Sequence, residues 1–305
     1  LCVSELFIFF ISYFVNMKKQ ALHYFFSFLT FTFFTLTIIS CSDDTDEYTE
    51  NSSTTSSDNT TNDNTTESIK FVVVGVSGKI LTSSDGNTWT TRTSGTTGDL
   101  YGITYGNELY VAVNPSGTLH TSADGITWSS ISGVSDTHRA INFGNELFVT
   151  AGNSYIYTSS DGSSWNSRYY TSNFLREVNY GGGLYLAVGD SGTILTSSDG
   201  TTWTSRTSGI STSLRGVAYG NSTFVAVGGE YILTSSNGTN WTSGTSGAGS
   251  AHPLSGITFG NDTFVTVSYN GGLFTSSNNG ISWDNKTTDI YSITLGSALW
   301  DVTFG

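Results

Sequence analysis

The sequence is poor in charged residues, proline and cysteine, and these shortages exclude several classes of protein. Only 11% of the 305 residues are charged, and the formal net charge is −13. That balance argues against a nucleic-acid-binding surface, which needs clustered Lys and Arg. No His and Cys residues have the spacing of metal ligands, so neither a metal nor a cofactor is expected. Two prolines, 35 glycines, 14% aromatic residues and no helical periodicity indicate an all-β protein with many tight turns.

The first 68 residues have the features of an exported protein and no core-forming pattern. Residues 1–16 precede the first Met and are interpreted as translated sequence upstream of the true start, with an extended hydrophobic leader as the alternative. Residues 17–40 begin with a Met and two Lys and continue into a short apolar run, the pattern of a signal peptide. Residues 41–68 start with Cys41 and are rich in Ser, Thr, Asn and Asp, so they are predicted to form a disordered acidic tether.

The residues around Cys41 predict the location of the protein. The stretch IISC (38–41) resembles the lipobox of bacterial lipoproteins, which implies that Cys41 becomes the lipidated N-terminus. A free or disulfide-bonded Cys41 is the alternative, although the only other cysteine is Cys2. The acidic SDD that follows resembles the signal that sends Bacteroidetes lipoproteins to the outside of the outer membrane. The resemblance implies a surface-exposed outer-membrane lipoprotein that meets the membrane only through its anchor, and a periplasm-facing orientation remains the alternative.

Residues 69–305 are built from a repeat of about forty residues. The motif S-x-D-G-x-x-W, with variants, returns at residues 83–89, 122–128, 159–165, 197–203, 235–241 and 277–283. A full copy such as residues 214–243 contains four short runs rich in Val, Ile, Tyr, Phe and Thr, separated by Gly-Asn, Gly-Gly and Asn-Gly turns. Four antiparallel strands in each repeat correspond to one propeller blade. The prediction is therefore a six-bladed β-propeller.

The two ends of the repeat region complement each other. The first copy (69–89) has strands two to four and lacks strand one, whereas residues 299–305 match strand one alone. Pairing of residues 299–305 with the first copy would complete that blade, close the ring and cover two sheet edges. A truncated reading frame that once encoded more blades is the alternative.

The repeated motif resembles the Asp-box, also called the bacterial neuraminidase repeat. Asp-Gly supplies a tight turn, the Asp side chain can accept backbone N–H groups, and the Trp can cover the apolar gap between blades. Asn replaces Asp in the last two copies, at Asn237 and Asn278, which favours a turn over chemistry. The residues assigned this structural role are Asp85, Trp89, Asp124, Trp128, Asp161, Trp165, Asp199, Trp203, Asn237, Trp241 and Trp283.

The full repeat over residues 69–305 is similar to the propellers of the photosystem II assembly factor family and of related bacterial surface proteins. This resemblance implies the fold and leaves the function open, because such propellers serve many roles. True sialidases also carry Asp-boxes, but the Arg-Ile-Pro motif that begins their domains is absent, since the only prolines are Pro115 and Pro253.

The candidate binding residues stand at one position near the start of strand one, where the repeats differ. Strand one lines the central channel of a propeller, and the aligned residues are Tyr101, Arg139, Arg176, Arg215, Ser255 and Trp300. Three guanidinium groups facing one axis could hold a carboxylate, a phosphate or an acidic side chain, while Tyr101 and Trp300 could stack on a ligand. The alternative is that these Arg residues form structural ion pairs, for which Glu177 and Asp301 are nearby.

These observations predict a monomeric, non-catalytic binding or assembly module for a protein or a glycan, which would be held at the channel mouth. A further reading is a purely structural stalk head or assembly factor with no small ligand. A sialidase-like exo-glycosidase acting on an acidic sugar is the alternative, with Asp190 and Glu230 as acids in the turns between strands two and three. A second Arg series, at 92, 168 and 206, is expected to pack over the motif Trp. His120 stands where other copies have Leu and is expected in the core or at an edge.

Overall fold

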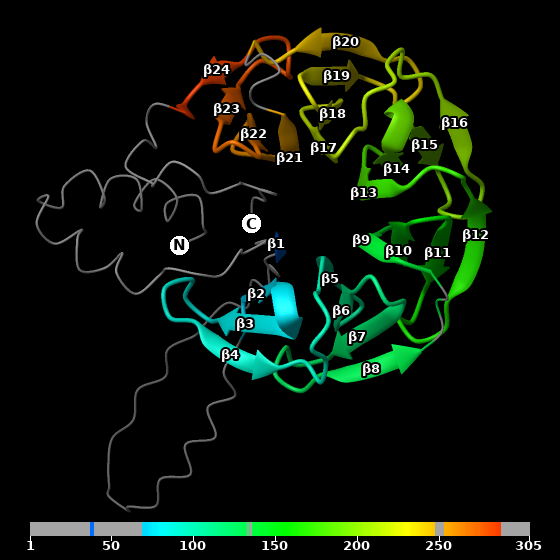
Figure 1. Cartoon of the computed structure of the whole chain (residues 1–305), viewed down its shortest axis with the longest axis vertical. Coiled ribbons are helices and arrows are strands. Elements are labelled where there is room, and N and C mark those ends of the chain that lie inside the picture. The colour runs from blue at the N-terminus through cyan, green and yellow to red at the C-terminus, as the bar shows by residue number, and fades with distance from the viewer. Residues whose placement is uncertain (1–36, 40–68, 133, 135, 248–252, 288–305) are drawn as a thin grey trace, which may run out of the picture.

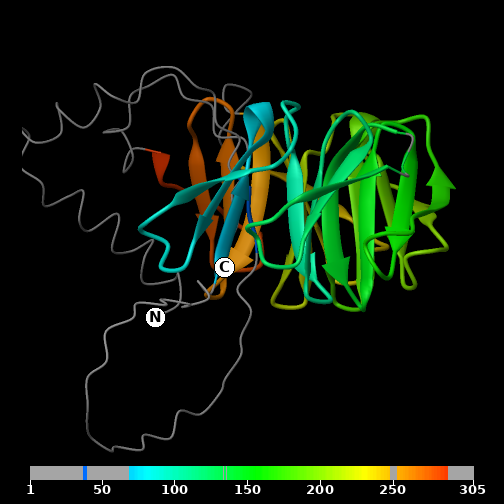
Figure 2. The same cartoon turned by 90° about the horizontal axis from the view of Figure 1, so that it is seen from below.

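The computed structural model describes residues 37–39, 69–132, 134, 136–247 and 253–287. These residues form six four-stranded antiparallel sheets, numbered blades 1 to 6 in chain order, that stand around a central axis (Figures 1 and 2). In each blade the strands follow one another in chain order, and in blades 2 to 6 the first strand lies nearest the axis. The architecture confirms the predicted six-bladed propeller.

The first three blades have the following strands. Blade 1 comprises β1 (Thr37–Ile39), β2 (Phe71–Val74), β3 (Lys79–Ser83) and β4 (Thr90–Thr93), with the 3-10 helix η1 (Val76–Gly78) between β2 and β3. Blade 2 comprises β5 (Gly102–Gly106), β6 (Leu109–Val113), β7 (Thr118–Ser122) and β8 (Ser129–Ser132). Blade 3 comprises β9 (His138–Gly144), β10 (Leu147–Gly152), β11 (Tyr155–Ser159) and β12 (Asn166–Tyr170).

The last three blades repeat the pattern. Blade 4 comprises β13 (Leu175–Gly181), β14 (Leu184–Gly189), β15 (Ile194–Ser197) and β16 (Thr204–Arg206), with the 3-10 helix η2 (Asp190–Gly192) between β14 and β15. Blade 5 comprises β17 (Gly216–Gly220), β18 (Thr223–Gly228), β19 (Tyr231–Ser235) and β20 (Thr242–Thr245). Blade 6 comprises β21 (Leu254–Gly260), β22 (Thr263–Ser268), β23 (Leu273–Ser276) and β24 (Asp284–Asn285).

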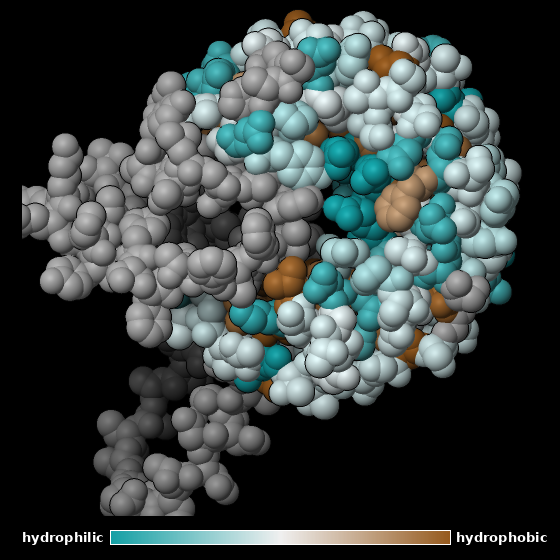
Figure 3. Space-filling view, in the orientation of Figure 1, coloured by the Kyte–Doolittle hydropathy of each residue, from teal (hydrophilic) through white to brown (hydrophobic). Residues whose placement is uncertain are grey.

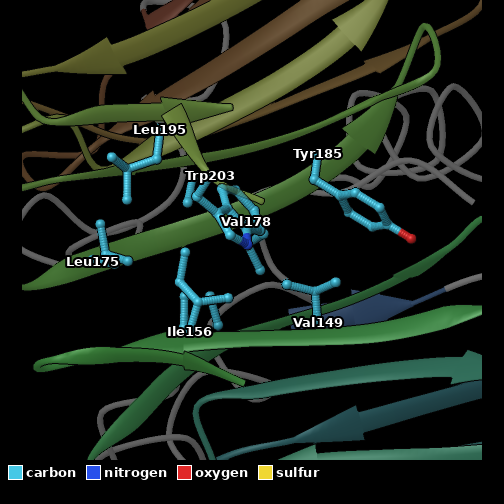
Figure 4. Close-up of a cluster of buried hydrophobic side chains, with 10 residues drawn as sticks. Val149, Ile156, Leu175, Val178, Tyr185, Leu195 and Trp203 are labelled. Atoms are coloured by element: carbon cyan, nitrogen blue, oxygen red, sulfur yellow. The ribbon is translucent and has the colours of Figure 1, made fainter. Parts of the chain in front are cut away.

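The hydrophobic core lies between the blades. Five apolar clusters fill the spaces between consecutive blades from 1 to 6. In the cluster between blades 3 and 4, Ile156 of blade 3 meets Leu175 and Trp203 of blade 4 (Figure 4). The motif Trp therefore packs between neighbouring blades, as the sequence predicted, in five of the six copies. Trp89 of blade 1 is 37% exposed, against 7% for Trp203.

The glycine that ends the innermost strand in blades 2 to 5 allows the next blade to pack closely. A Cβ on Gly181 would lie 2.4 Å from the Cβ of Tyr219. Gly106, Gly144 and Gly220 receive Phe143, Tyr180 and Phe259 in the same way. Because no side chain fits between these strands, an aromatic ring of each blade can seat directly on the backbone of the preceding one. This explains why the first strand of each copy ends in an aromatic residue followed by Gly.

Blade 1 differs from the prediction in the origin of its first strand. Here β1 pairs with β2, with Thr37 opposite Val74 and Ile39 opposite Val72. The strand predicted for this place, residues 299–305, lies outside the described residues, as do residues 1–36 and 40–68 with Cys41. Ring closure by residues 299–305, the segment boundaries before residue 69 and the tether therefore stay predictions.

Candidate binding face at the starts of the innermost strands

The repeated motif forms a self-contained turn on one face of the disc. In blade 2, Asp124 Oδ1 accepts the backbone N–H groups of Ile126 and Thr127 at 2.8 and 2.7 Å, and the Ser122 hydroxyl donates to it at 2.9 Å. The Trp128 indole N–H donates to the carbonyl of Gly125 at 3.0 Å. The N–H of Thr127 makes the largest contribution to lowering the pKa of Asp124, to about 2. The carboxylate is thus held ionised by local partners.

The Asn variants make the same turn. Asn237 Oδ1 accepts the backbone N–H groups of Thr239 and Asn240 at 2.9 and 3.0 Å. In the last copy, which has an extra residue, Asn278 Oδ1 accepts the N–H of Ser282 at 3.0 Å. Because a neutral amide accepts the same hydrogen bonds as a carboxylate, this position contributes to the turn through its hydrogen bonds and not through its charge. The predicted turn geometry of the motif is confirmed.

The opposite face of the disc carries the starts of the innermost strands, and it is named the binding face below. In blade 4 the start of β13 pairs with the end of β14, since Leu175 lies opposite Gly189. The motif turn follows Ser197, which pairs with Tyr185, itself opposite Tyr180 near the end of β13. The two features therefore lie at opposite ends of the blade, as predicted.

A β-bulge at the start of the innermost strand positions the candidate residues. The register between the first two strands shifts at Arg139, Arg176 and Ser255, each of which is the extra residue in its strand. The N–H groups of Tyr101 and Arg215 donate to the carbonyls of Val113 and Val227. Those two residues also lie opposite Gly102 and Gly216, so two residues of the first strand face one residue of the second. A bulge redirects one side chain out of the strand's alternation. A β-bulge therefore occurs at all five described positions.

Arg176 pairs with Asp190, the first residue of η2. Arg176 Nε donates to Asp190 Oδ1 at 2.5 Å, and the two side chains are 22% and 31% exposed. Burial raises the pKa of Asp190, but the hydrogen bonds from Arg176 and Ser213 and the charges of the two Arg residues together outweigh it and lower the pKa. The charge of Arg215 lowers the pKa of the same carboxyl by less than the hydrogen bond from Arg176 does. At least one of the three candidate Arg residues is therefore held in an ion pair with an acid.

Each candidate Arg also lies over an aromatic ring. The guanidinium carbon of Arg139 is 5.1 Å from the ring centre of Tyr101, in the preceding blade. That of Arg176 is 5.4 Å from Phe174, and that of Arg215 is 4.8 Å from Tyr269. Arg215 Nη1 also donates to the Tyr269 hydroxyl at 2.5 Å. Stacking holds the guanidinium planes in place and leaves their edges available for hydrogen bonds.

Hydrophilic side chains gather at the inner ends of β9, β13 and β17, the strands that carry the three Arg residues (Figure 3). The structure thus brings Tyr101, Arg139, Arg176 and Arg215 to one face of neighbouring blades. Trp300 and Asp301 lie outside the described residues, so their part in the site stays a prediction. Ser255 is 6% exposed and donates to the Val267 carbonyl.

Sequence reasoning missed Phe174, Tyr269 and the pairing of Arg176 with Asp190. The acid expected beside Arg176 was Glu177, and its Oε1 accepts the backbone N–H of Val178 at 3.1 Å. Asp190 and Tyr269 stand in loops between the second and third strands, where the copies differ in length and sequence. The sequence feature that could have pointed to Asp190 and Tyr269 is the variation of those loops, which were expected to lie on the binding face.

The outer Arg series has hydrogen bonds that the sequence did not predict. Arg92, Arg168 and Arg206 each donate Nε to a Thr hydroxyl on the neighbouring strand, all at 2.8 Å. Their contacts therefore join the third and fourth strands within a blade. These three residues carry as many positive charges as the three candidate Arg residues, but their hydrogen bonds hold the outer strands of the blades together.

Two histidines are buried between blades. His120 is 1% exposed, as predicted for a Leu position, and burial lowers its pKa. His138 is fully buried and replaces the Leu found at Leu100 and Leu175, a substitution that sequence reasoning missed. Its ring packs edge-on to Tyr157 at 5.3 Å, and burial lowers its pKa to about 4. Both rings are therefore neutral core residues at neutral pH.

Within the described ranges, no group of three or more His, Cys, Asp or Glu residues is placed to hold a metal ion. The same ranges contain no helix of the length and apolar character needed to cross a membrane.

Comparison with known proteins establishes the fold. No family model matches the chain, and no curated protein matches it. A solved structure described as YCF48 bound to D1 peptide matches with a TM-score of 0.59 at 20% identity, covering 72% of this chain and 78% of that one. YCF48 from Cyanidioschyzon merolae matches with a TM-score of 0.59 at 16% identity, covering 75% of this chain and 84% of that one. The fold is that of a β-propeller. At these identities the likeness concerns the fold alone, and at that level it supports the resemblance noted in the repeats.

Proposed function

We propose that the chain is a non-catalytic propeller that binds an acidic segment of a protein partner on its binding face. The observation that carries this proposal is the set of three guanidinium groups, at equivalent bulges in blades 3 to 5, each stacked on an aromatic ring. Guanidinium groups held in this way recognise carboxylates through forked hydrogen bonds, and exposed aromatic rings add contact area. The solved propeller with a bound D1 peptide supports a peptide as the type of ligand.

The segments before the propeller lead us to extend the proposal to location. The chain would be an Asp-box lipoprotein attached through Cys41, with residues 42–68 as a tether and the propeller held as a monomer at the outer-membrane surface. An acidic tether of 27 residues would let the disc move by about 30 Å from its anchor, since flexible chains span about 5–6 Å times the square root of their length. Binding would then depend on the disc and not on the membrane.

The test compares two triple variants of the full chain. Arg139→Ala, Arg176→Ala and Arg215→Ala together remove the proposed site, whereas the matched control changes Arg92, Arg168 and Arg206 to Ala. Both remove three positive charges, so only the position of the charges differs. Each protein is cross-linked in envelope fractions of its native cells, and the captured proteins are identified by mass spectrometry.

We expect proteins captured by the wild type to be lost with the first variant and retained with the control. Equal capture by both variants would show that the binding face is misassigned. Competition by free acidic sugars, but not by acidic peptides, would replace the protein partner with a glycan. No comparison favours the sialidase-like alternative, and none of these measurements requires turnover.

A further inference from the structure

The two 3-10 turns of the structure have the same backbone but differ in their first residue. Ser77 of η1 and Ser191 of η2 have φ of 56° and 55°, and each is followed by a glycine with φ of 68°. Added Cβ atoms on Gly78 and Gly192 would both lie 2.1 Å from a carbonyl oxygen of the following loop. The first residue is Val76 in one turn and Asp190 in the other. The turn itself therefore needs no carboxylate at this position.

The Asp190 carboxylate is directed at the binding face. It accepts Arg176 Nε, which is one of the five N–H donors of that guanidinium. The neighbouring charge of Arg215 acts on the same carboxylate. With 31% of its side chain exposed, Asp190 can also be reached from solvent. A negative charge is thus already paired with one of the three groups that the proposed function assigns to an acidic partner.

We propose that Asp190 is a built-in counter-ion that an acidic group of the partner displaces from Arg176. This inference rests on the proposed function and concerns its specificity. A ligand with a single carboxylate exchanges one ion pair for another and gains little, because a partly exposed ion pair contributes little on its own. A ligand with several carboxylates gains more, because it can also engage Arg139, which stacks on Tyr101. Asp190 therefore selects for segments with clustered acids.

The test measures binding of fluorescein-labelled hexaglutamate to the full chain by fluorescence anisotropy, with hexaglutamine as the neutral probe. Asp190→Asn keeps an oxygen that accepts Arg176 Nε but removes the charge. Asp99→Asn is the control, because Asp99 is another acid beside one of these turns and its Oδ1 accepts the Ser77 backbone N–H and not an Arg. We expect Asp190→Asn to bind hexaglutamate about fivefold more tightly at low salt, and Asp99→Asn to match the wild type. Hexaglutamine binding should not change.

The outcomes separate this inference from the proposed function. Unchanged or weaker hexaglutamate binding by Asp190→Asn overturns the counter-ion inference, and so does a failure of both the wild type and Asp190→Asn to bind the probe. If the triple variant of Arg139, Arg176 and Arg215 binds hexaglutamate as the wild type does, the binding face itself is wrong. Asp190→Val, which copies η1, should keep the wild-type melting temperature, so that altered binding cannot be attributed to a lost turn.

Discussion

At the scale of single residues, the chain separates positions that repeat from positions that vary. The motif acids repeat because every blade needs the same turn, and their hydrogen bonds are all local. This made their role predictable from the sequence. The Arg series was predicted because it breaks the repeat. Its partners were not, because Phe174, Asp190 and Tyr269 reach the Arg residues through loops whose paths the repeat does not fix.

The hydrogen-bond role of the motif can be tested at Asp124. Asp124→Asn should unfold at nearly the same urea concentration as the wild type, because Asn237 makes the same contacts in blade 5. Asp124→Ala should lose about 1 kcal/mol, the usual cost of removing a side-chain acceptor from backbone N–H groups at a turn or cap. Urea denaturation followed by tryptophan fluorescence measures both. A similar loss for Asn and Ala would mean that the charge matters.

The buried His138 predicts a pH dependence of stability. The Thr150 hydroxyl donates to the Ala140 carbonyl, so His138 Nδ1–H donates to Thr150, and Nε2 is left buried with no partner among the described residues. Burial lowers the pKa from 6.5 to about 4, against the opposing charge of Asp136. The unfolded chain binds the proton first as pH falls, so this stability is complete above about pH 6.5 and is lost toward pH 4.

His138→Leu should remove much of that dependence. Between about pH 7.5 and pH 5 the wild type should lose about 2 kcal/mol through this residue. The variant introduces the residue type that blades 2 and 4 have at the same position, Leu100 and Leu175. Thr150 keeps its hydrogen bond to the Ala140 carbonyl. The smaller dependence that remains would come from His120, whose pKa is also lowered by burial. Equal pH dependence of the urea midpoints in wild type and variant would contradict the assignment.

At the scale of elements, contact between blades depends on an aromatic residue of one strand meeting a glycine of the preceding strand. Strand identity and order followed from the period and from the Val, Ile and Tyr-rich runs. The bulges at Arg139, Arg176 and Ser255 did not, because one extra residue at the start of a strand changes no pattern in the sequence. The structure therefore adds the orientation of the candidate side chains to a topology that the sequence already indicated.

Gly181→Ala should destabilise the propeller by about 2 kcal/mol, since overpacking a close contact costs about 1–3 kcal/mol. Its new methyl group would meet the Cβ of Tyr219 at 2.4 Å, and that atom cannot move without its backbone. Gly244→Ala is the matched control, because the exposed strand β20 offers its methyl group no atom closer than 3.7 Å. Thermal melting should lower the midpoint of the first variant only. Equal midpoints would mean that the blades can separate without cost.

At the scale of the whole molecule, the period of the Trp residues was enough to count the blades, whereas the predicted closing contact would join chain segments far apart. In the structure, β1 occupies the inner side of β2, with Ile38 opposite Val73. Residues 37–39 belong to the segment predicted to be removed as a signal peptide. Residues 299–305 have the pattern of an innermost strand, and by analogy with Ile103 opposite Ala112 they would place Val302 opposite Val73. If that prediction holds, the two segments would compete for one edge.

Engineered disulfides can determine which strand occupies this edge. In a background with Cys2 and Cys41 replaced by Ser, Val73→Cys is combined either with Ile38→Cys or with Val302→Cys. For a chain starting at residue 41, we expect the Val73–Val302 pair to cross-link under mild oxidation, as detected by an altered mobility on non-reducing gels, because an uncovered inner edge of β2 would leave backbone groups unpaired. In the full-length chain, cross-linking of the Ile38 pair should reduce that of the Val302 pair. If the Val302 pair fails to cross-link in the shorter chain, residues 299–305 do not close the ring, and the edge of blade 1 is open to another strand.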